Sequence, residues 1–208
     1  EPLAKIAKTE VIIPTSFEFV DIAGLVQGAA QGEGLGNKFL SHIREVDAII
    51  QVIRCFEDED IHHVAGSIDP IRDIETIMTE LVLADMESVQ KSLDRRAKDA
   101  KKGDKTAKAE HAVLSKVLPH LNDGKPALTL ELNPEEAAIL KPFFLLTAKP
   151  TIFAANVKES ELVDAANNPH VAKVKNYAQE HHACETVVIS AQIESDLVDL
   201  APDEASDF

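Results

Sequence analysis

The sequence predicts an α/β fold: a mainly parallel sheet covered by helices, with an antiparallel helical hairpin inserted into it. Two observations predict the sheet, since short and nearly continuous apolar runs recur along the chain and segments with helical spacing separate them. A long helical segment between the second and third runs predicts the insert. The 208 residues are 45% hydrophobic and only 4% aromatic, a composition that suits aliphatic packing of this kind.

Four apolar runs are predicted to be strands. They are F-E-F-V-D-I (Phe17 to Ile22), D-A-I-I-Q-V-I-R-C-F (Asp47 to Phe56), T-I-F-A-A-N-V (Thr151 to Val157) and E-T-V-V-I-S-A (Glu185 to Ala191). N-K-F-L-S-H-I-R, from Asn37, is predicted to begin a helix before the second strand. After the third strand, Asn168-Pro169 is predicted to open a helix through about Glu180.

The insert is predicted to consist of two antiparallel helices. Asp69-Pro70 supplies a capping residue followed by proline at the first helical position. Helical spacing breaks at K-K-G-D-K (Lys101 to Lys105) and resumes until N-D-G-K-P, which predicts a hairpin with a basic tip. A strand candidate, A-L-T-L-E-L, and a short helix opened by Asn133-Pro134 lead back to the core.

Composition limits the possible functions. The net charge of −15 argues against a chain-wide affinity for nucleic acid or anionic membranes. No apolar run approaches the ~18 residues of a membrane span, so no membrane association is expected. Cys55 and Cys184 lie far apart without C-x-x-C spacing, which favours reduced thiols. We expect a cytoplasmic protein.

The glycine-rich stretch from Asp21 to Phe39 resembles a phosphate-binding loop but fails its tests. If Gly32 is taken as the first glycine of G-x-x-x-x-G-K-[ST], Asn37 and Phe39 occupy positions that require glycine and a hydroxyl. The spacing of Gly32, Gly34 and Gly36 also excludes G-x-G-x-x-G. This stretch is therefore not a phosphate cradle.

The start of the same stretch matches a different element. Asp21-Ile22-Ala23-Gly24 directly follows an apolar run and forms the D-x-x-G of GTPase-type switches. At the carboxyl end of a strand, Asp21 is placed to hold Mg²⁺ through water, and Gly24 to offer its N–H to a terminal phosphate.

Two further strands end in elements that contact a base in such switches. Asn156-Val157-Lys158-Glu159 stands where N-K-x-D is expected, and Ser190-Ala191 matches the S-A element. In N-K-x-D the aspartate accepts from two guanine donors. The longer Glu159 shifts the carboxylate out of register, which predicts loss of guanine specificity.

These motifs closely resemble the YchF, or Obg-like ATPase, family of translation-factor-related P-loop NTPases. The resemblance rests on F-V-D-I-A-G-L-V-Q-G-A-A-Q-G-E-G-L-G-N-K-F-L, R-C-F-E-D-E-D-I-H-H-V-A-G and L-L-T-A-K-P, and it covers essentially the whole chain. It implies an NTP-binding domain with an inserted helical hairpin, preference for ATP, dependence on Mg²⁺ and association with ribosomes. We accordingly predict a nucleotide-binding domain from 1–68 and 142–208 and a helical domain from 69–141. We expect a monomer.

The chain departs from that family at both ends. The family's G-x-x-x-x-G-K-[ST] loop and C-terminal TGS domain are not found in this sequence. We therefore expect the 208 residues to be the middle of a longer protein, and by themselves to hydrolyse ATP negligibly.

Catalysis needs a group that orients the attacking water. Leu25 stands where Ras-like switches place a glutamine, and a leucine cannot orient water. His63 lies in an acidic loop beyond a strand; the residues alone leave it undecided between a role and an idle loop histidine. The resemblance implies a catalytic role for His63 with Gly24. The glycines after Leu25 predict a second switch that reorganises when the γ-phosphate leaves, formed by Asp21, Gly24, Leu25, Gly28, Gly32, Gly34 and Gly36.

A basic cluster marks the hairpin tip. From Arg95 to Lys108 the chain has seven positive and two negative side chains, against the overall negative charge. Contact with ribosomal RNA phosphates and a merely solvated hairpin end are both consistent with this pattern. The candidate contacts are Arg95, Arg96, Lys98, Lys101, Lys102, Lys105 and Lys108.

Overall fold

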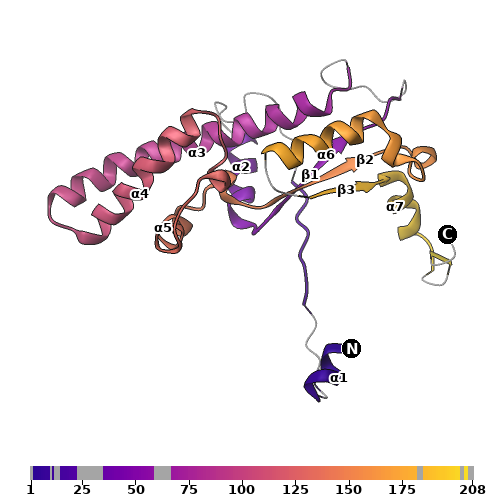
Figure 1. Cartoon of the computed structure of the whole chain (residues 1–208), viewed down its shortest axis with the longest axis horizontal. Helices are drawn as coiled ribbons and strands as arrows, with labels where there is room; N and C mark the ends of the chain where they lie inside the picture. Colours follow the sequence, from indigo (N-terminus) through magenta and orange to yellow (C-terminus); the bar gives the residue numbers. More distant parts are fainter. Residues whose placement is uncertain are drawn as a thin grey trace.

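A computed structural model of the chain describes residues 2–9, 11, 15–22, 35–58, 67–181, 185–201 and 204–205. Figure 1 shows a parallel sheet with helices packed against it and a pair of long helices, α3 and α4, extending to one side. This is the α/β architecture with a helical hairpin that the sequence predicts.

The sheet contains three described strands in the order β1-β2-β3. They are β1 (Ile49–Arg54), β2 (Thr151–Asn156) and β3 (Thr186–Ile189), and both pairings are parallel. Three of the four predicted strands are therefore confirmed. The prediction for Phe17 to Ile22 is wrong, because these residues are extended but pair with no described strand.

One face of the sheet forms the core. Side chains alternate between the two faces of a strand, so Ile53 of β1 lies beside Ala155 of β2 on the same face. Helices α3 (Pro70–Lys101) and α6 (Pro169–His181) cover this face. The buried cluster there includes Ile53, Ile74, Phe153, Ala155, Val171, Val174 and Ala178. Helix α6 confirms the helix predicted from Asn168-Pro169.

The hairpin consists of α3 and α4 (Lys105–Asn122), as predicted. The side chain of Asp69 accepts from the Arg72 N–H at the start of α3, and Asp104 accepts from the Ala107 N–H at the start of α4. Gly103, in the turn between the helices, has a φ of 98°, a conformation that favours glycine. Apolar side chains from both helices are buried between them: Val82, Val89, Leu93, Val113, Leu114, Val117 and Leu121.

Short helical turns connect the hairpin to β2. They are η1 (Ala127–Thr129), α5 (Pro134–Leu140), η2 (Lys141–Phe143) and η3 (Leu146–Ala148). The strand predicted for A-L-T-L-E-L is wrong, because its first half is the turn η1. The short helix from Pro134 is confirmed, and Asn133 with Glu136 forms a complete capping box at its start.

Besides α1 (Pro2–Ala7) near the N-terminus, the described residues form four further helices or turns. They are α2 (Leu35–Glu45), η4 (Glu159–Glu161), η5 (Ala165–Asn167) and α7 (Ala191–Val198). Helix α2 begins two residues earlier than predicted, so Gly36 lies inside its first turn instead of in the loop before it. Leu40 and Ile43 of α2 pack against α3 in a cluster that includes Leu81, Ala84 and Leu146.

Candidate functional site

The three strands end at one edge of the sheet, where open α/β sheets bind ligands. Arg54, Asn156 and Ile189 are neighbours in the ladder at the carboxyl ends of β1, β2 and β3. The ladder continues beyond the strands, since Cys55 N–H donates to the Asn156 carbonyl at 2.8 Å and Val157 N–H to the Ile189 carbonyl at 2.9 Å. The sheet hydrogen bonds therefore fix the positions from which the segments after β1 and β2 start.

The structure brings together the two elements predicted to contact a base. The Asn156 side-chain oxygen accepts a hydrogen bond from the Ala191 N–H at 2.9 Å. Ala191 is the first residue of α7, and first-turn N–H groups have no partner within their own helix. Asn156 supplies that partner, which fixes the end of β2 to the start of α7.

The other predicted base contacts differ in their surroundings. Glu159 is exposed at the start of η4. Ser190 is buried, and its hydroxyl has no hydrogen-bond partner among the described residues. Val157 corrects an expectation, because its side chain is 2% exposed and packs in the core beneath the sheet. Its side chain therefore cannot contact a nucleotide.

An ion pair that no sequence motif predicted joins the segments after β1 and β2. The Lys158 ammonium lies 3.3 Å from the Asp58 carboxylate. Arg54 holds the same segment, because its guanidinium donates to the carbonyls of Phe56 at 3.1 Å and Asp58 at 3.2 Å and lies 4.8 Å from the Phe56 ring centre. The signal that could have revealed the pair is the opposite charge of two residues that lie a few positions after the ends of neighbouring parallel strands.

Much of the predicted switch lies outside the described residues. Asp21 is described and exposed, close to the end of the extended segment 15–22. The predicted switch and catalytic residues that lie outside the described ranges are Gly24, Leu25, Gly28, Gly32, Gly34 and His63. The described ranges contain no cluster of three or more His, Cys, Asp or Glu side chains arranged to hold a metal ion.

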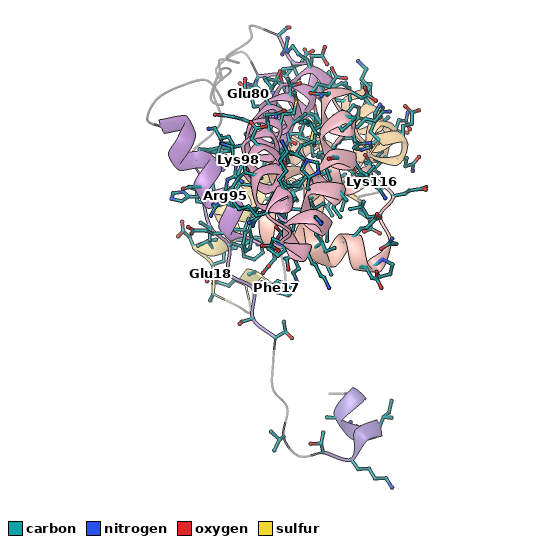
Figure 2. The ribbon with its side chains drawn as sticks, turned by 90° about the vertical axis from the view of Figure 1, so that its left-hand side faces the viewer. Phe17, Glu18, Glu80, Arg95, Lys98 and Lys116 are labelled. Carbon is teal, nitrogen blue, oxygen red and sulfur yellow. The ribbon has the colours of Figure 1, made fainter. Side chains whose placement is uncertain are left out.

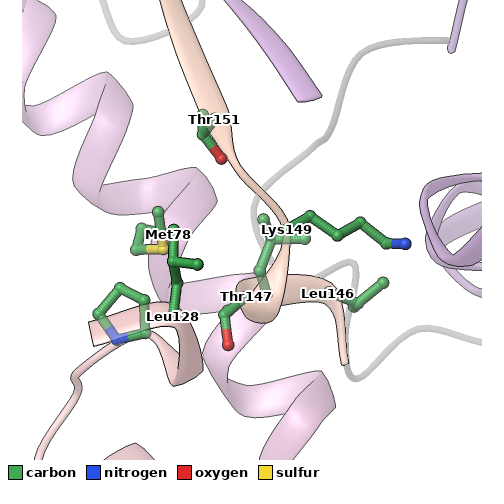
Figure 3. A pocket seen from close by; sticks show the side chains of 8 residues that line it. Met78, Leu128, Leu146, Thr147, Lys149 and Thr151 are labelled. Carbon is green, nitrogen blue, oxygen red and sulfur yellow. The ribbon is translucent and has the colours of Figure 1, made fainter. Parts of the chain in front are cut away.

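Helix α2, which directly follows the glycine-rich stretch, is fastened to the segment before β2. The Lys149 ammonium donates to the carbonyl of Arg44 at 3.1 Å and to that of Val46, and the Arg44 guanidinium donates to the Phe144 carbonyl at 3.3 Å. Figure 3 shows the Lys149 side chain extending away from a small hollow that is lined by Met78, Leu128 and Thr147. Burial lowers the pKa of Lys149, with the charge of Arg44 acting in the same direction.

A buried carboxylate fastens the same segment to the hairpin. Asp85 of α3 is fully buried and accepts hydrogen bonds from the Leu146 N–H at 2.8 Å, the Thr147 N–H at 2.8 Å and the Thr147 hydroxyl at 2.7 Å. The Thr147 hydroxyl in turn accepts from the Ala127 N–H at 3.0 Å. Burial raises the pKa of Asp85, while these hydrogen bonds oppose the shift.

The basic cluster lies at the hairpin tip, at one end of the molecule (Figures 1 and 2). Most of its members are exposed: Arg95, Lys98, Lys101, Lys102, Lys105 and Lys108. Arg96 differs from the others, because its guanidinium pairs with Glu110 at 2.5 Å across the hairpin. Arg96 is thus already engaged in holding the two helices together.

Among the helices in the described ranges, none is long and apolar enough to cross a bilayer.

Comparisons with known proteins agree with this architecture. A family model described as 50S ribosome-binding GTPase matches residues 5–89. The YchF GTPase of Schizosaccharomyces pombe superposes with a TM-score of 0.78 at 35% identity, covering 99% of this chain and 56% of that one. The fold is therefore that of a G-domain-like α/β protein.

The curated relatives narrow the class to a family. Proteins named ribosome-binding ATPase YchF from Bacillus subtilis, Haemophilus influenzae and Escherichia coli O157:H7 are 48%, 49% and 45% identical over all 208 residues. Along its whole length the chain is therefore similar to the YchF family. It spans 56–57% of the length of these relatives.

Proposed function

We propose that the chain forms the core of a nucleotide-dependent switch that binds and hydrolyses ATP, and GTP less well, and that associates with ribosomes. The observation that supports this most directly is the hydrogen bond from Ala191 to Asn156, which joins two base-recognition elements at the ligand-binding edge of the sheet. The relatives' names, ribosome-binding ATPase, support the same assignment. The nucleotide-binding domain would comprise 1–68 and 142–208, and 69–141 would be the helical insert.

The residues at this edge would have different roles in nucleotide binding and hydrolysis. Asn156, Ser190 and Ala191 would form the base-binding edge, and Glu159 would weaken guanine recognition. Asp21 is an exposed oxygen donor, which suits a Mg²⁺ ion that keeps most of its waters and is held mainly by phosphates. Gly24 would donate its N–H to the γ-phosphate. Because Leu25 cannot orient the attacking water, His63 would do so.

Nucleotide titration of the intact protein tests the base assignment. ATP should bind more tightly than GTP. Glu159→Asp should shift the ratio of the two Kd values toward GTP, because the shorter side chain places its carboxylate where it can accept from both guanine donors. Glu135→Asp, an equally exposed change in α5, is the matched control and should leave the ratio unchanged. Tenfold tighter binding of GTP by the unaltered protein would contradict the assignment.

A second candidate is a ribosome- or protein-binding module for which nucleotide is only a ligand. Leu25 favours it, because a site without a glutamine to orient water is expected to be slow without a partner. ATP turnover by the intact protein, measured with and without ribosomes, separates the candidates. Turnover that ribosomes stimulate supports the switch, whereas binding without turnover in both conditions supports the module.

A further inference from the structure

We propose that Asn168 is a positioning residue for the nucleotide-binding edge, fixing the segment that contains Glu159 to the segment after β1. This inference rests on the proposed function, because the edge must bind nucleotide for such positioning to affect it. Asn168 immediately precedes α6 and belongs to none of the predicted nucleotide-binding elements. The contacts of its side-chain amide support the proposal.

The Asn168 amide is bonded on both sides. Its oxygen accepts from the His170 N–H at 2.8 Å and the Val171 N–H at 3.2 Å, so it caps α6. Its nitrogen donates to the Cys55 carbonyl at 3.0 Å and to the Glu161 carboxylate at 3.1 Å. A primary amide has two donor hydrogens and two acceptor lone pairs, so its capacity is fully used and its orientation is fixed.

The two donor bonds reach the two segments that matter for the site. Cys55 is the first residue after β1 and begins the segment that leads toward His63. Glu161 lies in η4, the turn that Glu159 begins. The pair between Lys158 and Asp58 joins the same two segments a second time. The side-chain nitrogen of Asn168 therefore connects η4, which contains Glu159, to the segment that leads toward His63.

Substitutions can distinguish the role of the amide oxygen from that of the amide nitrogen. Asn168→Asp keeps an oxygen to cap α6 but loses both donor hydrogens and places a second carboxylate beside Glu161. Adding Glu161→Gln returns a donor to the pair from the other side. A role in capping alone would be preserved in the single variant. A positioning role would be lost in the single variant and recovered in part in the double variant, which regains the bond to residue 161 but not the bond to the Cys55 carbonyl.

The test uses the intact protein with Kd for ATP, kcat for ATP hydrolysis and thermal unfolding as readouts. Asn168→Asp should weaken ATP binding by up to roughly tenfold, the effect expected when the loss of a hydrogen bond to a charged group acts fully on the nucleotide-binding edge. Because the lost bonds lie within the folded chain, Tm should also fall by a few degrees. Addition of Glu161→Gln should recover part of this loss in Kd, because it restores a hydrogen bond between residues 161 and 168 but not the one to the Cys55 carbonyl. Asn168→Ser, which caps without adding charge, should weaken ATP binding in the same way.

A neighbouring asparagine provides the matched control. Asn167 also donates its amide to a carboxylate, that of Asp164 at 2.6 Å, but this bond stays within one loop. Asn167→Asp should therefore leave ATP binding unchanged. Unchanged Kd and kcat in Asn168→Asp would overturn the proposal, as would a loss that follows a fall in Tm and is not recovered by Glu161→Gln. Absence of ATP binding by the unaltered protein would instead overturn the proposed function.

Discussion

The buried carboxylate of Asp85 shows how one residue can connect distant parts of the chain. Its side chain reaches from α3 to two successive N–H groups more than sixty positions later, at Leu146 and Thr147. Because those N–H groups are also buried, removing the acceptor would leave them unsatisfied at a cost of about 1–3 kcal/mol. Asp85 thus ties the base of the hairpin to the strand that carries Asn156.

Asp85 also predicts a pH dependence of stability. Burial raises its folded-state pKa above the ordinary value of 3.8, so the folded chain binds this proton more tightly than the unfolded chain. The resulting stability is present below 3.8 and is lost as pH rises through the folded pKa. We expect the free energy of unfolding of the unaltered chain, minus that of Asp85→Asn, to decrease as the pH rises above 3.8. Urea unfolding at several pH values measures it, and an increase would show that the three hydrogen bonds outweigh burial.

Cys55 gives a second prediction for a single residue. Burial, with the nearby charge of Glu161, raises the pKa of its thiol to about 12. Since the thiolate is the reactive form, Cys55 should be inert to a thiol reagent in the folded chain and fully reactive in urea. The measurement uses a chain with Cys184→Ser, so that only Cys55 is counted. Rapid labelling without denaturant would contradict the prediction.

At the scale of elements, the hairpin depends on the apolar contacts between α3 and α4. Leu114 is fully buried there, so Leu114→Ala should lower the free energy of unfolding by about 2–5 kcal/mol. Leu83 of α3 is 38% exposed, and Leu83→Ala should cost under about 1 kcal/mol. Denaturant unfolding of both variants tests this, and equal losses would show that the hairpin core contributes little to stability.

The hairpin tip provides a prediction about binding. Lys101 and Lys105 are exposed, so changing both to Glu should weaken the proposed ribosome association of the intact protein and reduce its dependence on salt. Lys173→Glu with Lys175→Glu, on the exposed side of α6, controls for the change in net charge. Sedimentation with ribosomes at two salt concentrations is the measurement. Equal effects of the two sets would indicate a general charge effect instead of a contact.

The elements show where sequence patterns succeed and fail. Helices with caps and helical spacing, such as α3 and α6, were predictable because their hydrogen bonds are local. The error at Phe17 to Ile22 has a physical cause, since a strand exists only with a partner and none of the described strands pairs with it. At Ala127, the Thr147 hydroxyl satisfies an N–H that a ladder would otherwise take, and a turn forms instead.

The candidate site was predictable only in part. The positions of Asn156 and Ser190 followed from the rule that parallel strands end at one edge. The hydrogen bonds around the site did not follow, because their partners lie far apart in the sequence: Asn156 and Ala191 are 35 positions apart, and Asn168 and Cys55 are 113 positions apart. No short motif contains both members of such a pair.

At the scale of the whole molecule, several apolar side chains on the second face of the described sheet are exposed. Ile50, Val52, Ile152 and Val187 lie on it and are 37–60% exposed. An apolar surface of this kind predicts that the 208-residue chain binds the dye ANS. Val52→Lys should reduce the fluorescence, whereas Val163→Lys, at a fully exposed position away from the sheet, should not. Equal fluorescence in all three would show that the dye binds elsewhere.

The register between β1 and β2 has a consequence for the order of folding. Ile49 pairs with Thr151, about a hundred residues later, and closing so long a loop is entropically costly and slow. The hairpin between them forms from local contacts, and once folded it shortens the flexible chain that must close. We therefore expect α3 and α4 to assemble before the sheet does, so that the inserted helices act as an internal scaffold for the strands on either side of them.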